Sequence, residues 1–209
     1  MAADGLIEHD GVVRCWWCGD HADYQAYHDD EWGRPVDDDR RLFEKMSLEG
    51  FQSGLSWLTI LRKRENFREA FDGFDFDVIA RWRASKVETL LKNAGIVRHR
   101  GKIEAVLSNA KCMRALLDEH GSFAAYAWLY EPDPSSRPSR LTKKELFALT
   151  QTDESKALAK DLKKRGFRFF GPTTAYAFMQ AMGMVNDHVE GCATRPLVQS
   201  DRNAFRRPT

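Results

Sequence analysis

The 209-residue sequence lacks any long hydrophobic run, and no stretch approaches the ~20 consecutive apolar residues that a membrane span requires. Its first residues also lack the basic region followed by an apolar one that marks a secretory signal. Both absences lead us to expect a cytoplasmic protein. Cysteine is scarce too, with four residues, which excludes a disulfide-rich scaffold and favours free thiols or metal ligands in a reducing compartment. Alternation typical of strands does not persist, and repeats of a solenoid type are absent.

Charge is abundant and nearly balanced, but it is unevenly distributed. Apolar residues make up 43% of the chain and charged residues 30%, which excludes a fibrous or disordered protein and favours one globular unit. Residues 1–50 carry 13 acidic and 5 basic side chains, a net charge of −8, so the remainder carries +9. The basic residues form three runs that are compatible with a bound polyanion, although such runs are more often solvated helix faces. The runs are Arg62-Lys63-Arg64, Arg98 to Lys102 and Lys160 to Arg168.

Apolar spacing indicates helices along nearly the whole chain, so we predict an all-α fold class. N-caps, a capping box and glycine stop signals mark the expected helix ends. The first of these helices follows Asp37 to Asp39, and the second runs from Leu55 to Phe71. The third begins at the capping box Ser85 to Glu88 and stops at Gly95. The fourth runs from Ile103 to Leu117, before Gly121.

The chain divides into a helical body and two ends. We expect a single helical domain over residues 13–197, with two lobes around a pocket. Three prolines make residues 131–140 a long loop inside this domain. Residues 1–12 and the basic stretch 198–209 are expected to be mobile tails.

Two segments share a finer pattern of helix, short glycine-bearing turn and second helix, with turns at residues 94–98 and 165–171. Glycine permits the positive φ that such a turn needs, and the next helix begins with unpaired N–H groups that can hold a phosphate. Flanking basic side chains would add charge-assisted contacts. An ordinary helix corner with a glycine C-cap explains the pattern equally well. The candidate DNA-binding residues are Lys164, Arg165, Gly166, Phe167, Arg168 and Gly171.

Side chains that can bind a metal ion gather near both ends of the chain. His188 and Cys192 are spaced i, i+4, so on a helical turn they face the same way. With Cys15 and His28 they form a Cys2His2 set, which suits tetrahedral zinc in a structural role. The alternative is that His188 is a hydrogen-bonded core residue and Cys192 a small buried apolar one. Two nearby residues compete as ligands, Cys18 and His21.

Glu49 is the candidate for a functional carboxylate. It follows an apolar helical segment and precedes a glycine-rich break that leads to Trp57. A buried carboxylate is costly unless it is paired, which favours a functional reason for it. The alternative is a partly exposed glutamate at a helix end. Residues 28–31 are a weaker candidate for a hydrolytic metal cluster, because adjacent residues cannot all face one ion.

Six blocks in order along the chain carry a family resemblance, and they cover most of it from Cys15 to Pro196. The sequence resembles DNA-3-methyladenine glycosylase I, the constitutive bacterial enzyme that repairs alkylated bases. Ordered blocks of this kind are far more specific than a single motif. They are Tyr27-His-Asp-Asp-Glu-Trp-Gly33, Leu48-Glu-Gly-Phe-Gln-Ser-Gly-Leu-Ser-Trp57, Lys63 to Asn66, Asn93 to Lys102, Leu162 to Phe167 and Val185-Asn-Asp-His-Val-Glu-Gly-Cys192.

The resemblance implies an all-helical fold of the helix-hairpin-helix glycosylase superfamily, acting as a monomer on double-stranded DNA. It implies that a structural zinc ion staples the chain ends through the four cysteines and histidines named above. Glu49 would read the alkylated base, in a pocket lined by Tyr27 and Trp57 with Trp17 and Tyr24 nearby. The expected reaction is hydrolysis of the N-glycosidic bond of 3-methyladenine, with 3-methylguanine as a further substrate, which leaves an abasic site.

One position departs from the wider superfamily in a way that bears on the chemistry. Related glycosylases carry Val-Asp-x-His with a catalytic aspartate, whereas this chain has Val185-Asn186-Asp187-His188. If the histidines align, Asn186 replaces the aspartate. A base alkylated at N3 already carries positive charge and leaves as a neutral molecule, so less acid–base help is needed.

No lysine occurs in the pocket blocks 15–33 and 48–57, so we expect no Schiff base and no strand cleavage. Two other classes of function stay open at this level. The first is a zinc-stapled DNA-binding protein without catalysis, and the second is a metal-dependent hydrolase that uses His28 to Glu31. Trp16 and Cys18 stand where the family pattern has smaller or apolar residues.

Overall fold

The structure is a computed structural model that describes residues 5–138 and 140–209. It consists mostly of α-helices, as predicted, with one short β-hairpin that the sequence analysis missed. The strands are β1 (Leu6–His9) and β2 (Val12–Cys15), and the short 3-10 helices are η1 (Trp16–Cys18), η2 (Asp72–Phe74) and η3 (Pro134–Ser136). The α-helices are α1 (Ala22–Asp30), α2 (Asp39–Gln52), α3 (Trp57–Leu61), α4 (Arg64–Ala70), α5 (Phe76–Ala80), α6 (Ser85–Leu90), α7 (Arg100–His120), α8 (Phe123–Trp128), α9 (Lys143–Ala148), α10 (Asp153–Lys164), α11 (Pro172–Ala181) and α12 (Thr194–Ala204).

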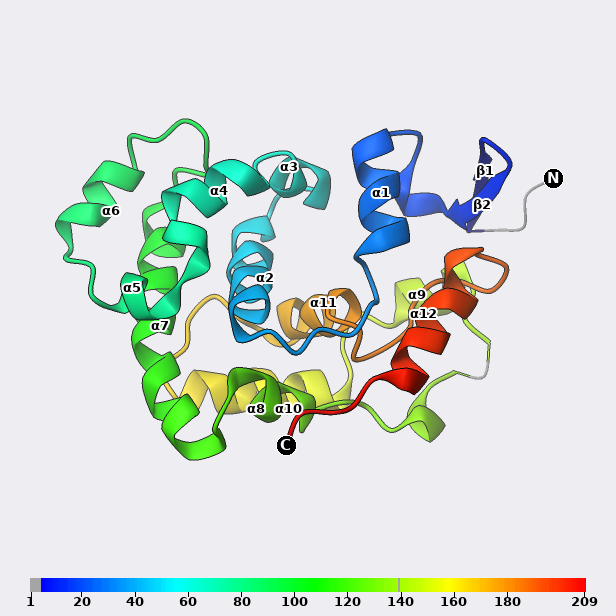
Figure 1. Ribbon diagram of the computed structural model, residues 1–209. Coiled ribbons are helices and arrows are strands. Elements are labelled where there is room, and N and C mark those ends of the chain that lie inside the picture. Colours follow the sequence, from blue (N-terminus) through cyan, green and yellow to red (C-terminus); the bar gives the residue numbers. More distant parts are fainter. Residues whose placement is uncertain (1–4, 139) are drawn as a thin grey trace.

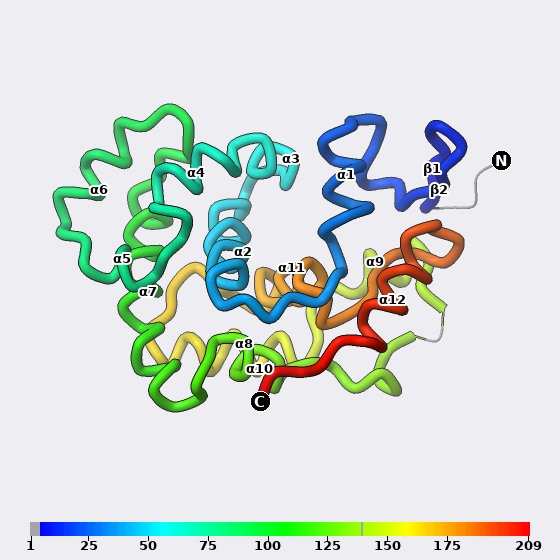
Figure 2. The backbone as a smooth tube through the Cα atoms, viewed as in Figure 1, coloured from blue at the N-terminus to red at the C-terminus, as the bar shows by residue number. Residues whose placement is uncertain are grey.

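Helices α2 and α11 lie in the middle of the molecule and pack against each other (Figure 1). Helices α4 to α7 lie on one side of this pair, and the β-hairpin, α1 and α12 lie on the other. The backbone tube in Figure 2 shows that the first and last parts of the chain meet on that second side. There the Ala193 amide donates a hydrogen bond of 2.9 Å to the Val13 carbonyl oxygen. The fold therefore brings the segment around Val13 next to the segment around Ala193.

The N-terminal hairpin corrects the predicted tail over residues 1–12. β1 and β2 pair antiparallel, with Leu6 opposite Cys15 and His9 opposite Val12. The turn between them is Asp10-Gly11, and both residues have positive φ, 54° and 74°. Two turn residues with positive φ match the right-handed twist of the flanking strands, and Asp-Gly is a typical sequence for such a turn. The sequence therefore contained a signal for this hairpin. Residues 1–4 of the predicted tail lie outside the described residues.

The C-terminal tail predicted over residues 198–209 is also wrong. α12 continues to Ala204, because Val198 and Arg202 are buried against the body, and beyond it Arg207 pairs with Glu131 at 2.8 Å. The Arg202 guanidinium donates to the Gly183 carbonyl oxygen and forms an ion pair of 2.9 Å with Glu131. These contacts attach a strongly charged helix that apolar spacing alone does not reveal.

α2 is the central support of the fold. Asp38 caps it by accepting a hydrogen bond of 2.8 Å from the Arg41 amide, as the aspartate run predicted. Its apolar positions Phe43, Leu48 and Phe51 are almost fully buried in the core. Most of the helix is buried on more than one face, so even its charged residues must find internal partners.

Three helix boundaries differ from the prediction. The run from Leu55 to Phe71 is divided into α3 and α4. The Ser85 capping box is wrong, because Ala84 precedes α6 and no side chain caps it; α6 ends at Leu90, short of Gly95.

The long helix is confirmed as α7, which ends at Gly121 with φ 79°. Residues 131–138 and 140 lack α-helix, as expected for a proline-rich loop; residue 139 lies outside the described residues.

Within the described residues, no helix is both long and apolar enough to cross a membrane.

Candidate active site

A cavity of about 470 Å³ opens between α1, η1, α2, α3, α9 and α11. Its volume falls within the usual range for small-molecule sites, and its wall is largely aromatic with a few polar groups. All five residues predicted for the base pocket line it, namely Tyr24, Tyr27, Trp17, Glu49 and Trp57. The other lining residues are Trp16, Trp32, Gln52, Leu146, Phe147, Ala177 and Gln180.

The rings hold one another in place. The ring centroids of Tyr27 and Trp57 are 5.3 Å apart, and those of Trp17 and Tyr24 are 5.2 Å apart, both in tilted arrangements. Trp57 begins α3, and Ser56 caps that helix by accepting a hydrogen bond from the Thr59 amide. The indole Nε1 of Trp57 is buried and has no hydrogen-bond partner within the described residues. Unpaired buried donors are rare outside sites that bind a ligand or water.

Glu49 is 6% exposed, so the alternative of a partly exposed helix-end glutamate is wrong. Its Oε1 lies 2.8 Å from the Nζ of Lys45, one turn earlier on α2. Burial lowers the pKa of Lys45, and the negative charge of Glu49 opposes that effect. Burial raises the pKa of Tyr27, with Glu49 adding to the rise, so this phenol stays protonated. The site therefore holds an ion pair and a neutral hydroxyl among aromatic rings.

Lys45 is a residue that the sequence analysis missed. The absence of lysine from the pocket blocks does not keep lysine away from the pocket, because Lys45 lies just outside the second block and reaches back by one helical turn. Its Nζ is 2.8 Å from the Tyr27 hydroxyl oxygen and 3.2 Å from the Trp57 ring centroid. The i, i+4 spacing of Lys45 and Glu49 was the available signal.

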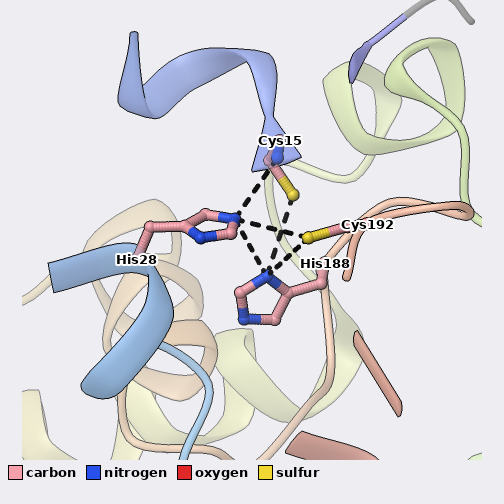
Figure 3. A group of neighbouring side chains, drawn as sticks. All are labelled: Cys15, His28, His188 and Cys192. Atoms are coloured by element: carbon pink, nitrogen blue, oxygen red, sulfur yellow. Dashed lines mark hydrogen bonds between the residues drawn. The ribbon is translucent and has the colours of Figure 1, made fainter. Parts of the chain in front are cut away.

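The four predicted metal ligands meet in the structure (Figure 3). The ligand atoms of Cys15, His28, His188 and Cys192 all lie within 4.8 Å of one another, and all four residues are buried. The Sγ of Cys192 is 3.6 Å from both His28 Nε2 and His188 Nδ1. Two sulfur and two imidazole nitrogen atoms at such separations form a donor set that suits a closed tetrahedral site.

Outer contacts orient both histidines, as is usual around bound metals. The Nδ1 of His28 is 2.7 Å from the Asp29 carboxylate, which Arg14 also binds. The Nε2 of His188 is 3.0 Å from the Trp32 carbonyl oxygen. Each imidazole thus keeps one nitrogen for the cluster and uses the other to fix its ring.

The two cysteines of the cluster influence each other, and the rival ligands lie outside it. The contact with Cys192 raises the pKa of the Cys15 thiol, and the same contact lowers the pKa of Cys192, which favours one thiolate in the pair. The Sγ of Cys18 donates to the Cys15 carbonyl oxygen instead. His21 is the half-exposed residue that precedes α1. The sequence could not choose between these candidates, and the geometry does.

The cluster and the cavity share a wall. The Trp17 ring lies 5.0 Å from the His28 ring, and the Trp32 ring lies 4.8 Å from the His188 ring, centroid to centroid. Both tryptophans also line the cavity. The four residues of the cluster come from the first and last parts of the chain. Their packing therefore holds those two parts together along one wall of the cavity.

The second glycine-bearing turn joins α10 to α11 in the way the sequence predicted. Gly166 has φ 93°, its amide donates to the Lys163 carbonyl, and the Phe167 amide donates to the Leu162 carbonyl. These two bonds form a Schellman C-cap, with the buried side chains of Phe167 and Leu162 beneath it. Asn109 of α7 binds both the amide and the carbonyl of Arg168, at 2.8 and 3.1 Å.

The candidate DNA-binding side chains of this turn differ in what they contact. Arg165 forms ion pairs with Glu119 and Asp161, and Phe167 is buried, so both support the turn from inside. Lys164 and Arg168 are exposed, and within the described part of the chain neither side chain has an ion-pair partner. Gly166 and Gly171 are exposed too, and Gly171 precedes α11 without a side-chain cap.

Gly95 of the first turn lacks the positive φ that was expected there, so only the second turn has the predicted glycine geometry. The two turns lie together beside the helix that carries Glu49. The rings of His99, which caps α7, and Phe169 are 6.0 Å apart. A side chain at Gly50 would lie 3.2 Å from the Phe169 carbonyl oxygen, and one at Gly101 would lie 3.3 Å from its ring. Glycine at these two positions allows α2, α7 and the second turn to approach closely.

Asn186 lies away from the aromatic cavity. It lines a separate cavity of about 200 Å³, and its Nδ2 donates to the Arg195 carbonyl oxygen. The neighbouring Asp187 is fully buried and accepts hydrogen bonds from Tyr176, Gln180 and Arg137. The segment before His188 therefore brings no carboxylate to the cavity wall, although Asp187 supports Gln180, which lines it.

Comparisons with known proteins agree on one family. The family model for methyladenine glycosylase matches residues 17–195. The chain is 46% identical to DNA-3-methyladenine glycosylase of Haemophilus influenzae over 190 residues, which covers 87% of this chain and 97% of the relative. It is 45% identical to DNA-3-methyladenine glycosylase 1 of Escherichia coli over 185 residues, with coverage of 88% and 98%.

Solved structures give the same result. A crystal structure of 3-methyladenine DNA glycosylase I superposes with a TM-score of 0.80 at 48% identity and covers 86% of this chain and 98% of its own. The 3-methyladenine DNA glycosylase I of Staphylococcus aureus superposes with a TM-score of 0.80 at 34% identity, with coverage of 88% and 96%. Identity this high over most of both chains, together with the shared fold, shows that this chain belongs to the methyladenine glycosylase family and is a DNA glycosylase that acts on N-glycosyl bonds.

Proposed function

We propose that this protein hydrolyses the N-glycosidic bond of 3-methyladenine, and of 3-methylguanine, in double-stranded DNA and leaves an abasic site. The observation that carries the proposal is a buried carboxylate, Glu49, on the wall of an aromatic cavity that is large enough for a base. A structural relative with a TM-score of 0.80 and 33% identity is described in complex with 3-methyladenine, which supports the same ligand here.

The cavity favours a damaged purine by charge. Alkylation at N3 gives the base a positive charge that normal adenine lacks. An aromatic face such as that of Trp57 attracts a cation by about 0.5 to 2 kcal/mol. The Glu49 carboxylate adds charge-assisted hydrogen bonds to the base edge. Glu49 thus acts on the base directly, and Tyr27 and Trp57 enclose it.

The chemistry requires little from the protein beyond this environment. A cationic purine leaves the sugar as a neutral molecule, and water then attacks the oxocarbenium-like sugar. If the histidines align, Asn186 stands where related glycosylases carry the catalytic aspartate, and it lines a separate cavity. Lys45 lies behind Tyr27 and Trp57 with its ammonium bound to Glu49, and it does not line the cavity. This placement supports a monofunctional enzyme without a Schiff base.

The glycine-bearing turns are the proposed DNA contact. The exposed residues Lys164, Gly166, Arg168 and Gly171 and the free amides at the start of α11 offer charge and donors to backbone phosphates. In this proposal Arg165 and Phe167 do not contact DNA but stabilise the conformation of the turn. A base rotated out of the duplex would then enter the nearby cavity.

Zinc is the proposed structural cofactor, held by Cys15, His28, His188 and Cys192. The buried Cys2His2 donor set fits it, since no open position is left for a catalytic water. The ion would join the two ends of the helical domain proposed over residues 13–197 and fix the cavity wall at Trp17 and Trp32. A monomer and a cytoplasmic location stay predictions.

The proposed function is tested with duplex DNA treated with a methylating agent. Incubation with the protein is expected to release free 3-methyladenine, detected by chromatography, and to leave strands that break only after alkali treatment. Release no faster than without protein, combined with tight duplex binding, would instead make this a DNA-binding protein without catalysis. Activity lost on chelation and restored by several divalent ions would favour a metal-dependent hydrolase.

A further inference from the structure

Lys45 is an unusual residue to find buried next to the aromatic cavity. It is 5% exposed, and an ammonium group is costly to bury unless its donors are all used. The group carries three N–H donors, and three partners surround it. These are the Glu49 carboxylate at 2.8 Å, the Tyr27 hydroxyl at 2.8 Å and the face of the Trp57 ring, whose centroid lies at 3.2 Å.

The three partners come from three different helices. Tyr27 belongs to α1 and Trp57 to α3, while Glu49 lies one turn beyond Lys45 on α2. Tyr27 from α1 and Trp57 from α3 therefore both contact the Lys45 ammonium. Within the described residues, Lys45 is in turn the only polar partner of the Glu49 carboxylate. A buried carboxylate held on one oxygen has a fixed direction, and its second oxygen is left for a ligand.

Lys45 reaches this carboxylate from behind the cavity. It lines a second, small cavity of about 40 Å³ on the other side of Tyr27 and Trp57. Glu49 lines the large cavity, and Lys45 does not. The base that enters the large cavity would therefore meet the carboxylate and the rings but not the ammonium.

We propose that Lys45 is a positioning residue for base recognition, which acts by holding the Glu49 carboxylate in the direction that the damaged base requires. The inference rests on the proposed function. Its physical basis is preorganisation: a carboxylate already fixed in place loses less freedom when the base binds. Lys45 does not touch the base and forms no bond with the sugar.

Lys102 provides a matched control. It is a second buried lysine, 8% exposed, and its Nζ donates to the backbone carbonyl oxygens of Phe51 and Ser53. It stabilises the loop after α2 without contacting a carboxylate. Lys45→Met and Lys102→Met each replace one buried lysine with methionine. Because only Lys45 contacts Glu49, only the effect of Lys45→Met should depend on whether Glu49 is present.

The experiment measures kcat/KM for release of 3-methyladenine from methylated duplex DNA in six proteins. They are the unaltered chain and Glu49→Gln, each alone, with Lys45→Met and with Lys102→Met. Lys45→Met is expected to lower kcat/KM by about 10- to 100-fold, as expected for loss of a hydrogen bond to a charged group. In the Glu49→Gln background the same substitution is expected to cost less than about 3-fold, because the group it positions has already changed. Lys102→Met is expected to cost the same factor in both backgrounds.

Lys45→Met leaves a buried carboxylate without its partner and could prevent folding. The double variant of Lys45→Met and Glu49→Gln avoids this, since it removes both charges, and its comparison with Glu49→Gln still decides the question. An equal loss from Lys45→Met in both backgrounds, or no loss in either, would overturn the positioning role. A loss in the double variant as large as about 10-fold relative to Glu49→Gln would overturn it too. Lack of base release by the unaltered chain would instead overturn the proposed function, and the role of Lys45 with it.

Discussion

At the residue scale, two buried carboxylates serve different purposes, and their partners show which. Asp187 accepts hydrogen bonds from Tyr176 and Gln180 and binds the Arg137 guanidinium, so its oxygens are fully used. Glu49 has Lys45 as its single polar partner within the described residues and lies on a cavity wall. A buried acceptor with remaining capacity requires a ligand or water, whereas a saturated one stabilises the fold.

Glu49→Gln is expected to reduce base release by about 10- to 100-fold, since it replaces charge-assisted hydrogen bonds to the base with neutral ones. Release from methylated DNA measures the effect, and circular dichroism checks the fold. Glu44→Gln is the control, because Glu44 lies on the same helix but pairs with Arg68. Equal rates for the unaltered chain and Glu49→Gln would remove Glu49 from its role.

At the element scale, the turn between α10 and α11 depends on one glycine. Gly166 has φ 93°, and an added Cβ would lie 3.2 Å from the Cys112 Sγ. The turn is also held by Asn109 and by Arg165, so it is rigid before any DNA binds. A preformed turn of this kind presents its amides to phosphate without further ordering.

Gly166→Ala is expected to lower the free energy of unfolding by about 1 to 2 kcal/mol, because alanine is strained at positive φ. Thermal unfolding measures this change. Gly171→Ala is the comparison: Gly171 has φ −85° and open space around it, so stability should change by less than about 0.5 kcal/mol. Equal melting temperatures for the Gly166 variant and the unaltered chain would show that the turn tolerates a side chain.

Arg168→Gln tests whether this turn contacts DNA. The exposed guanidinium is expected to neutralise one phosphate, so the variant should bind all duplexes more weakly, and the slope of log affinity against log salt should fall by about 1. Arg114→Gln is the control, because the Arg114 guanidinium is exposed but already forms an ion pair of 3.2 Å with Asp118, one turn further along α7. An unchanged salt slope for Arg168→Gln would contradict the proposed interface.

The ion pairs of Arg165 should make stability depend on pH. The hydrogen bond from Arg165 lowers the pKa of Asp161, and a similar bond lowers the pKa of Glu119. A lowered carboxyl pKa contributes stability above the ordinary value of about 4, and this contribution is lost as the pH falls through the folded-state value. Arg165→Gln is therefore expected to lower the free energy of unfolding at pH 7 and to have much less effect near pH 3, measured by chemical unfolding. An equal cost at both values would show that the carboxylates are not involved.

How far the sequence predicted these elements depended on whether the signal was local. Gly166 and the helices around it follow from spacing and caps, and the structure confirms them. The hairpin at Asp10-Gly11 was just as local, yet its strands are too short to show alternation. Lys45 was missed for a different reason: its partners on α1 and α3 meet it only through tertiary packing. The four metal ligands span more than 170 residues, and the family resemblance assigned them, because spacing alone left Cys18 and His21 as rivals.

At the scale of the whole molecule, the Cys2His2 cluster joins the two ends of the chain beside the cavity. Cys15 follows β2, and Cys192 precedes α12. The ring contacts of Trp17 and Trp32 with the cluster histidines connect this joint to the cavity wall. The stability of the fold and the shape of the site are therefore both expected to depend on the zinc ion proposed for this cluster.

Cys192→Ser should lose the metal and lower the melting temperature, because structural zinc contributes directly to folding. Metal analysis of the unaltered chain should find about one zinc per molecule. Cys18→Ser is the matched control, since Cys18 lies beside the cluster but donates to a carbonyl oxygen, and it should keep the zinc. Retention of metal and stability by Cys192→Ser would show that the ligand set is wrong.

The proposed binding place of the damaged base is the aromatic cavity beside Glu49. A crystal structure of the protein with 3-methyladenine tests it most directly. We expect the purine to lie in the cavity between Tyr27 and Trp57, with its edge within hydrogen-bond distance of the Glu49 oxygen that Lys45 leaves free. A purine bound elsewhere, or one in the cavity with no contact to Glu49, would contradict it.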